Sequence, residues 1–232
     1  MIPGASSAPA GERPRLYGVY PAIVTDVQDP DSQGRVQIRL PFVEESDGGS
    51  ALAWARLATL MAGADRGTWF IPEVDDEVLV AFTAGDPRRP VVIGALWNGV
   101  DTPPESMDSA NNIRSITSRS GHTLTFDDTA GAEKVELKTK GGHTFTLDDA
   151  AGGTVTLTHS NGAQVKIDVV GNIEITANVR VTVQAPAGLE VTAAMVTVNA
   201  AMSTFSGVVK ADAVITNSVV SPSYTPGVGN IW

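Results

Sequence analysis

The second half of the chain repeats one short pattern of apolar and polar residues. Between residues 124 and 198, two apolar residues flank a single non-apolar residue in nine places: Leu124/Phe126, Val135/Leu137, Phe145/Leu147, Val155/Leu157, Val165/Ile167, Ile173/Ile175, Val181/Val183, Leu189/Val191 and Val196/Val198. Because successive side chains of a β-strand point to opposite faces, each pair predicts a short strand with one apolar face. The steps between pairs are 11, 10, 10, 10, 8, 8, 8 and 7 residues.

Two nearly identical nonapeptides belong to this series: SGHTLTFDD (120–128) and GGHTFTLDD (141–149). Gly121, Gly142 and Gly162 precede alternate strands, as expected of turn residues. A flat sheet of one chain would leave its apolar side uncovered. The remaining arrangements are a solitary β-solenoid and a prism to which three chains each contribute one side. Steps of eight to ten residues are too short for a complete coil of one chain, so we expect a trimeric, intertwined β-helix (a β-prism) that narrows toward the C-terminus.

The first hundred residues show another pattern, of strands separated by turns rich in Pro, Gly and Asp. In RVQIRLPF (35–42), Val36, Ile38 and Leu40 share one face, after the turn DPDSQG (29–34). Five or six such segments in this length predict a small OB-fold barrel, so the whole chain is expected to be all-β. The expected divisions are a tail (1–15), the OB-fold domain (16–100), a linker (101–118), the spike (119–220) and a tip segment (221–232).

Composition excludes several classes of function. The formal net charge is −10, which opposes binding to the phosphate backbone of nucleic acids. The chain has no cysteine, so it forms neither disulfides nor thiolate metal sites. No apolar run reaches the ~20 residues that span a bilayer, and the first fifteen residues lack the apolar core of a signal peptide. We therefore expect a product made in the cytoplasm.

The stretches RVQIRLPF (35–42) and WARLATLMAGADRGTWFIPEVDDEVLVAFTAGDPRRPVVIGALWNG (54–99), followed by the β-helix pattern, resemble the spike proteins of contractile injection systems. These include phage baseplate assembly protein V and the OB-plus-spike part of VgrG; the layout is that of the short spikes of extracellular, phage-tail-like particles. The resemblance implies a non-enzymatic homotrimer at the centre of a baseplate, which pierces the target envelope. It also implies a hub or tube-initiating protein at the OB end, a PAAR-type tip protein at the C-terminal end, and room for effector cargo. Such a spike is released or membrane-anchored as part of an injection particle or virion.

The sequence departs from the family pattern at several points. Asp75 stands before DEV where the family often has Gly, and Asp tolerates the left-handed conformation better than most residues. No hub-forming region precedes the barrel, so the hub is expected to be a separate protein. Residues 101–119 are too few for the lysozyme domain of some phage spikes. The last 70 residues contain no histidine, so the iron site that closes some phage tips is not expected.

No catalytic, cofactor or metal site is expected from the motifs. Asp127/Asp128 and Asp148/Asp149 look like paired carboxylates, but neighbouring side chains point apart, which favours polar turn residues. His122 and His143, with His159, permit a metal-binding ring on a threefold axis. Polar ring packing or an outward turn position is favoured over it. Trp54, Trp69 and Trp97 are expected as anchors of the barrel core rather than contacts between subunits.

The C-terminal segment SPSYTPGVGNIW (221–232) breaks the repeat and ends on an aromatic residue. It either folds over the open end of the prism or contacts the tip protein, and the residues expected at such a contact are Pro222, Tyr224, Pro226, Ile231 and Trp232. Two other functions remain as alternatives. One is a polysaccharide-degrading or glycan-binding β-helix protein, and the other is an OB-fold nucleic-acid binder with an oligomerising tail.

Overall fold

The computed structural model describes residues 15–44 and 50–222. These residues form β-strands and no α-helix; the only helical turns among them are the short 3-10 segments η1 (Thr83–Gly85) and η2 (Ala150–Gly152). The all-β prediction is therefore confirmed. Within the described ranges, no helix has the length and apolarity needed to cross a membrane. The chain divides into one unit that ends at Val179 and a second that begins at Arg180.

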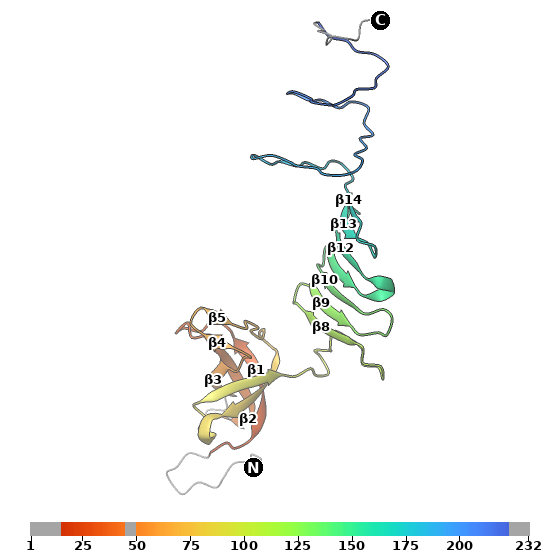
Figure 1. Ribbon diagram of the computed structural model, residues 1–232. Coiled ribbons are helices and arrows are strands. Elements are labelled where there is room, and N and C mark those ends of the chain that lie inside the picture. The colour runs from red at the N-terminus through yellow and green to blue at the C-terminus, as the bar shows by residue number, and fades with distance from the viewer. Residues whose placement is uncertain (1–14, 45–49, 223–232) are drawn as a thin grey trace, which may run out of the picture. The chain divides into compact units, whose positions relative to one another are not determined.

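The N-terminal part is a closed five-stranded barrel (Figure 1). Its strands are β1 (Val19–Asp26), β2 (Val36–Glu44), β3 (Ser50–Leu57), β6 (Glu77–Phe82) and β7 (Pro90–Ala95). They close in the order β1-β2-β3-β7-β6, in which β3 and β7 are parallel and every other pair is antiparallel. A five-stranded Greek-key barrel of this kind is the OB-fold expected from the sequence.

The barrel core is filled by alternate residues of its strands. The predicted face of β2 is buried: Val36 and Ile38 have no exposed surface and Leu40 has 3%. The other buried apolar residues are Leu16, Tyr20, Ala22, Val24, Ala55, Val78, Val80, Phe82 and Val92. Most of these side chains are small, because a five-stranded barrel has a narrow interior.

The segment between β3 and β6 leaves the barrel wall and returns to it through a tight turn. It contains a two-stranded hairpin, β4 (Ala62–Gly63) and β5 (Arg66–Gly67). At its end, the N–H of Asp75 donates to the carbonyl of Val24 at 2.9 Å, which ties the turn to β1. Asp75 has a φ of 78°, so the prediction that Asp replaces Gly in a left-handed turn is confirmed.

A seven-stranded antiparallel meander, here called the ladder, follows the barrel in the chain (Figure 1). Its strands are β8 (Ile113–Thr117), β9 (Thr123–Asp127), β10 (Lys134–Lys138), β11 (Thr144–Asp148), β12 (Thr154–Thr158), β13 (Gln164–Ile167) and β14 (Ile173–Thr176). Strands β9 to β14 contain the first six predicted apolar pairs. Strand β8 lies in the segment interpreted as a linker. Its Ile113 and Ile116 are three residues apart and therefore do not show the alternation that predicts a strand.

The second unit has a different character. In its described part, residues 180–222, no strand forms, although three predicted strand pairs lie there. A strand needs a hydrogen-bonded neighbour, and steps of seven or eight residues leave little chain for the turns of a meander. Apolar side chains such as Val183 and Val191 are exposed along this segment. The predicted strands at 181–183, 189–191 and 196–198 are thus not formed within a single chain.

Candidate trimer interface

The apolar residues of the ladder lie directly opposite one another in neighbouring strands. Strand pairing places them in two continuous columns. The first column is Ile116, Leu124, Leu137, Phe145, Leu157, Val165 and Ile175. The second column is Phe126, Val135, Leu147, Val155, Ile167 and Ile173. The repeated apolar pairs of the sequence therefore form one apolar face. They do so because each pair of neighbouring strands is in the register that places apolar residues opposite one another.

This apolar face is largely exposed in the single chain. Leu137 is 51% exposed, Leu157 54% and Ile173 68%. Fully burying one side chain of this size gains about 1.5–3 kcal/mol, and a contiguous apolar face of this extent marks an interaction surface. The face therefore needs a second layer, and no segment of the described residues packs on it within the chain.

The other face of the ladder is polar. Its central column, again in register, consists of Ser115, Thr125, Glu136, Thr146, Thr156, Lys166 and Glu174. A loose ion pair joins Lys134 Nζ to Asp127 Oδ2 at 4.0 Å on this side. The ladder thus has one face for burial and one for water, as antiparallel sheets with one solvated side do.

Four turns of the ladder share one five-residue form. They are Ser118–His122, Thr139–His143, His159–Ala163 and Asp168–Asn172. In each, the first residue's N–H donates to the carbonyl of the fifth, and the glycine at the fourth position donates to the carbonyl of the first. That glycine has a φ between 83° and 91°, a conformation that side chains with a Cβ rarely adopt. The turn glycines predicted from sequence therefore set the register of the ladder.

The histidines link turns on the same edge of the ladder. His122 Nδ1 accepts a hydrogen bond from the N–H of Lys140 at 3.3 Å, and His143 Nδ1 accepts one from the N–H of Ser160 at 3.2 Å. The rings of His143 and His159 pack with centroids 4.3 Å apart. Within one chain the rings therefore pack at turns, and their arrangement around a threefold axis stays a prediction. Within the described residues, no group of three His, Asp or Glu side chains is placed to hold a metal ion.

The paired aspartates serve the turns, as expected. Asp127 Oδ1 accepts from the N–H of Thr129 at 3.0 Å, and Asp148 Oδ1 accepts from the N–H of Ala150 at 2.8 Å. The hydrogen bonds from Thr129 lower the pKa of Asp127 below its ordinary value, and the charge of Lys134 adds to the effect. Asp127 and Asp148 are therefore turn caps, whereas Asp128 forms an ion pair with Arg114.

The tryptophans were expected in the barrel core, and this prediction is wrong. Trp69 is 77% exposed and Trp97 69% exposed. Trp54 is half-buried and lies beside Ala55, whose side chain faces the core, so the indole of Trp54 faces outward. The interior of the barrel is already filled by aliphatic residues together with Tyr20 and Phe82.

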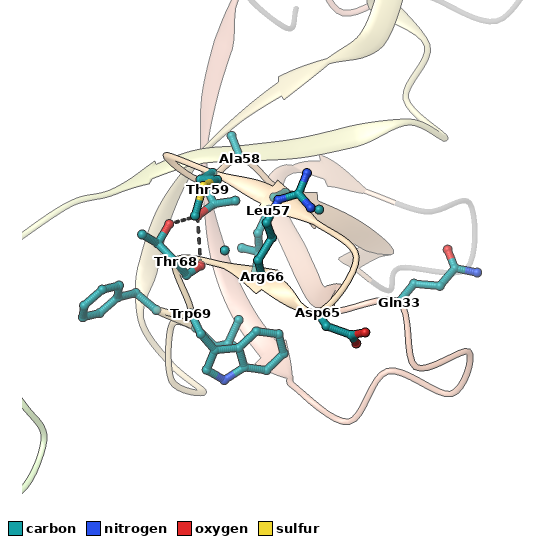
Figure 2. A pocket seen from close by; sticks show the side chains of 15 residues that line it. Gln33, Leu57, Ala58, Thr59, Asp65, Arg66, Thr68 and Trp69 are labelled. Atoms are coloured by element: carbon teal, nitrogen blue, oxygen red, sulfur yellow. Dashed lines mark hydrogen bonds between the residues drawn. The ribbon is translucent and has the colours of Figure 1, made fainter.

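Trp69 instead forms part of a cavity of about 560 Å³ beside the β4–β5 hairpin (Figure 2). Figure 2 shows Asp65, Arg66 and Trp69 around it, with the Thr59 hydroxyl bonded to the Thr68 carbonyl at 2.9 Å. The neighbouring Phe70 is also exposed. The charged residues of its lining are Asp65 and Arg66.

The residues predicted to contact a tip protein are mostly outside the described residues. This applies to Tyr224, Pro226, Ile231 and Trp232. Pro222 is the last described residue and is exposed. The contact stays a prediction.

Two family models match the chain in the two regions just described. Residues 20–97 match the type VI secretion system/phage-baseplate injector OB domain, and residues 134–204 match the phage baseplate V C-terminal trimerisation domain. The first match falls on the barrel and the second begins at β10 and extends into the second unit. The chain belongs to the phage baseplate V family of spike proteins.

Curated relatives of the chain include VgrG proteins of two bacteria. It is 30% identical over 136 residues to the type VI secretion system spike protein VgrG3 of Vibrio cholerae, and 32% identical over 135 residues to VgrG4b of Pseudomonas aeruginosa. It is 29% identical over 150 residues to the actin cross-linking toxin VgrG1 of Vibrio cholerae. These matches cover 54%, 53% and 59% of this chain, but only 13%, 17% and 14% of the relatives.

The family match and the exposed face of the ladder lead to the same quaternary structure. The trimerisation domain supports a homotrimer, and the two apolar columns are exposed in the single chain. The match also supports a structural role as a spike for this family member.

Proposed function

We propose that the protein is the trimeric central spike of a contractile, phage-tail-like injection particle and that its action on the target envelope is mechanical. The observation that carries the proposal is the ladder's apolar face, which is exposed in one chain and whose strands β10 to β14 lie within the match to the trimerisation domain. Contraction of a sheath drives the spike forward, and three ladders packed on their apolar faces resist the axial load.

The distribution of charge supports a piercing role for the C-terminal part. After residue 175 the charged residues are Arg180, Glu190, Lys210 and Asp212. Moving a charged side chain into an apolar environment costs far more than moving a hydroxyl or an aliphatic group. A segment that carries few charges therefore enters an envelope at lower cost.

In this proposal the protein has no catalytic activity of its own. The actin cross-linking activity in one relative's name belongs to a protein of which this chain matches 14%. The carboxylates considered as a catalytic pair cap turns instead. The partners are a separate hub or tube-initiating protein at the barrel, a PAAR-type tip protein at residues 221–232, and effector cargo. The protein is made in the cytoplasm, assembled into a baseplate, and then released or membrane-anchored with the particle.

The test compares assembled particles that carry the full chain with particles whose spike ends at residue 220. Three quantities are measured: assembly of the baseplate, retention of the tip protein, and leakage of a cytoplasmic marker from target cells. We expect the shortened spike to assemble, to lose the tip protein and to cause less leakage. Leakage at the full rate without the tip protein would contradict the tip assignment. Particles that assemble and act normally without any spike would contradict the function.

A further inference from the structure

The barrel has a concave surface rich in arginine, although the chain as a whole is acidic. A cavity of about 350 Å³ lies where β2 begins, β3 ends and β7 begins. Its lining includes Arg35, Arg56, Arg88, Arg89 and Trp54. These are four of the sixteen basic residues of a chain with net charge −10. We call this the arginine surface.

Two of these arginines are fixed within the barrel. Arg35 donates to Asp29 at 2.6 Å and to Asp31 at 2.6 Å, and its guanidinium lies 5.8 Å from the centre of the Trp54 ring. Arg88 donates through two nitrogens to the carboxylate of Asp86, at 2.8 and 3.0 Å. These bonds fix the positions of the Arg35 and Arg88 guanidinium groups within the single chain.

The other two arginines are free to bind a carboxylate. Arg89 lies 3.9 Å from Asp86 and is 71% exposed, so it keeps most of its donors. Arg56 is exposed and has no ion pair within the described residues. A planar guanidinium presents paired donors that match a carboxylate, so this surface selects an acidic partner.

The same barrel carries an acidic turn on another side. Residues 73–77, EVDDE, hold four acidic residues in five positions. Glu73 pairs with Arg119 at 2.8 Å and Glu77 accepts from Asn98 at 3.0 Å, so Asp75 is the acidic residue of this turn that is left for a partner. The turn is rigid because Asp75 donates to Val24 of β1 and the Asp76 carboxylate accepts from the N–H of Glu73 at 2.8 Å. Asp75 is exposed and has no ion pair within the described ranges. In the strand order β1-β2-β3-β7-β6, this turn belongs to β6 and β1, whereas the arginine surface belongs to β2, β3 and β7.

We propose that, in the trimer, the arginine surface of each barrel binds the acidic turn of the next barrel. A threefold ring is closed by heterologous contacts, in which two different surfaces of each copy meet, and these two surfaces have opposite charge. The barrels are tethered to ladders that are already joined, so even a weak contact is formed at high effective concentration. The contact rests on the trimer and is independent of the spike's mechanical role.

Disulfide cross-linking tests this contact, since the chain has no native cysteine. Val74→Cys and Thr83→Cys, placed together in the full chain, put a thiol beside each surface without removing a charge. After mild oxidation of the purified trimer, we expect covalent dimers and trimers on a non-reducing gel. Each single variant alone is expected to stay a monomer on the gel, because the contact joins unlike surfaces.

Charge variants in the same double-cysteine background decide whether the arginines matter. The double variant Arg56→Glu with Arg89→Glu is expected to reduce the cross-linking yield at least several-fold. Asp75→Asn is expected to reduce the yield less. Raised salt concentration is also expected to reduce it, because salt screens the attraction between exposed charges. Lys140→Glu, in the ladder, is the matched control and leaves the yield unchanged. The proposal is overturned if the intact trimer does not cross-link, if the single variants cross-link equally well, or if cross-linking survives the arginine substitutions. Binding of an acidic peptide or an oligonucleotide to the arginine surface of an uncross-linked trimer would assign that surface to another molecule.

Discussion

The Nδ1 atom of His143 accepts a hydrogen bond from the backbone N–H of Ser160, 3.2 Å away on the next turn along the same edge of the ladder. His122 makes the equivalent bond to Lys140 at 3.3 Å. Each copy of the nonapeptide therefore contributes a strand and also a histidine that accepts a hydrogen bond from the next turn on the same edge.

Replacing His143 by Ala is expected to weaken this edge. The substitution leaves the N–H of Ser160 without its acceptor and removes the ring contact with His159, so we expect a loss of about 0.5–1.5 kcal/mol in the free energy of unfolding. Chemical denaturation measures it. Ser160→Ala is the control, because it keeps the backbone N–H and should cost much less. Equal losses in the two variants would contradict the role of the histidine.

A charge on the apolar face is expected to prevent trimer formation. Leu157→Glu places a carboxylate in the column that three copies bury, and an unpaired buried charge costs about 3–5 kcal/mol. Thr146→Glu adds the same charge to the polar face and is the matched control. Light scattering after size-exclusion chromatography should show a trimer for the control and smaller or aggregated species for Leu157→Glu. A stable Leu157→Glu trimer would show that this face does not form the interface.

Asp75 offers a test of backbone strain in the barrel. Its φ of 78° suits Gly and is tolerated by Asp, but it is unfavourable for a β-branched residue. We expect Asp75→Val to lower the free energy of unfolding of the barrel by about 1–2 kcal/mol, and Asp75→Gly to leave it nearly unchanged or to raise it. Urea denaturation followed by tryptophan fluorescence measures both. A valine variant as stable as the glycine variant would contradict the strain argument.

The turn at Asp29 predicts how the barrel responds to acid. The side-chain bond from Arg35, together with backbone N–H groups of residues 31, 33 and 35, holds the pKa of Asp29 well below its ordinary value. A carboxyl whose pKa is depressed in the folded state contributes stability that is fully present above its unfolded pKa of about 3.9 and is lost as pH falls below that value. Asp29→Asn should therefore lower stability at neutral pH and flatten its decline between about pH 5 and pH 2. Denaturation across this range measures both effects, and parallel curves for the two proteins would contradict the prediction.

Much of the ladder and of the barrel core could be predicted, because the deciding forces act over a few residues. Leu124 and Phe126 must share a face in any β-strand, and the antiparallel pairing of β9 with β10 places them opposite Leu137 and Val135. Residues such as Val36 and Ile38 are buried by the same alternation. The prediction for Asp75 succeeded for a local reason too, since the turn itself demands a positive φ.

The failures involve residues whose position depends on distant segments. Trp69 is apolar enough for a core, but the narrow barrel is already full, and only its packing could show that. Strand β8 has no clear alternation of its own and is a strand because Ile116 pairs with Leu124 of β9. The arginine surface combines residues from three strands that lie far apart in the sequence.

By itself, the sequence determined strands β9 to β14, their apolar face and the glycine turns, because alternation and glycine conformation are local properties of the backbone. Tertiary structure decided which outward residues meet, as at His143 and Ser160 or around Arg56, because closure of the barrel and stacking of the turns join residues that no local pattern connects.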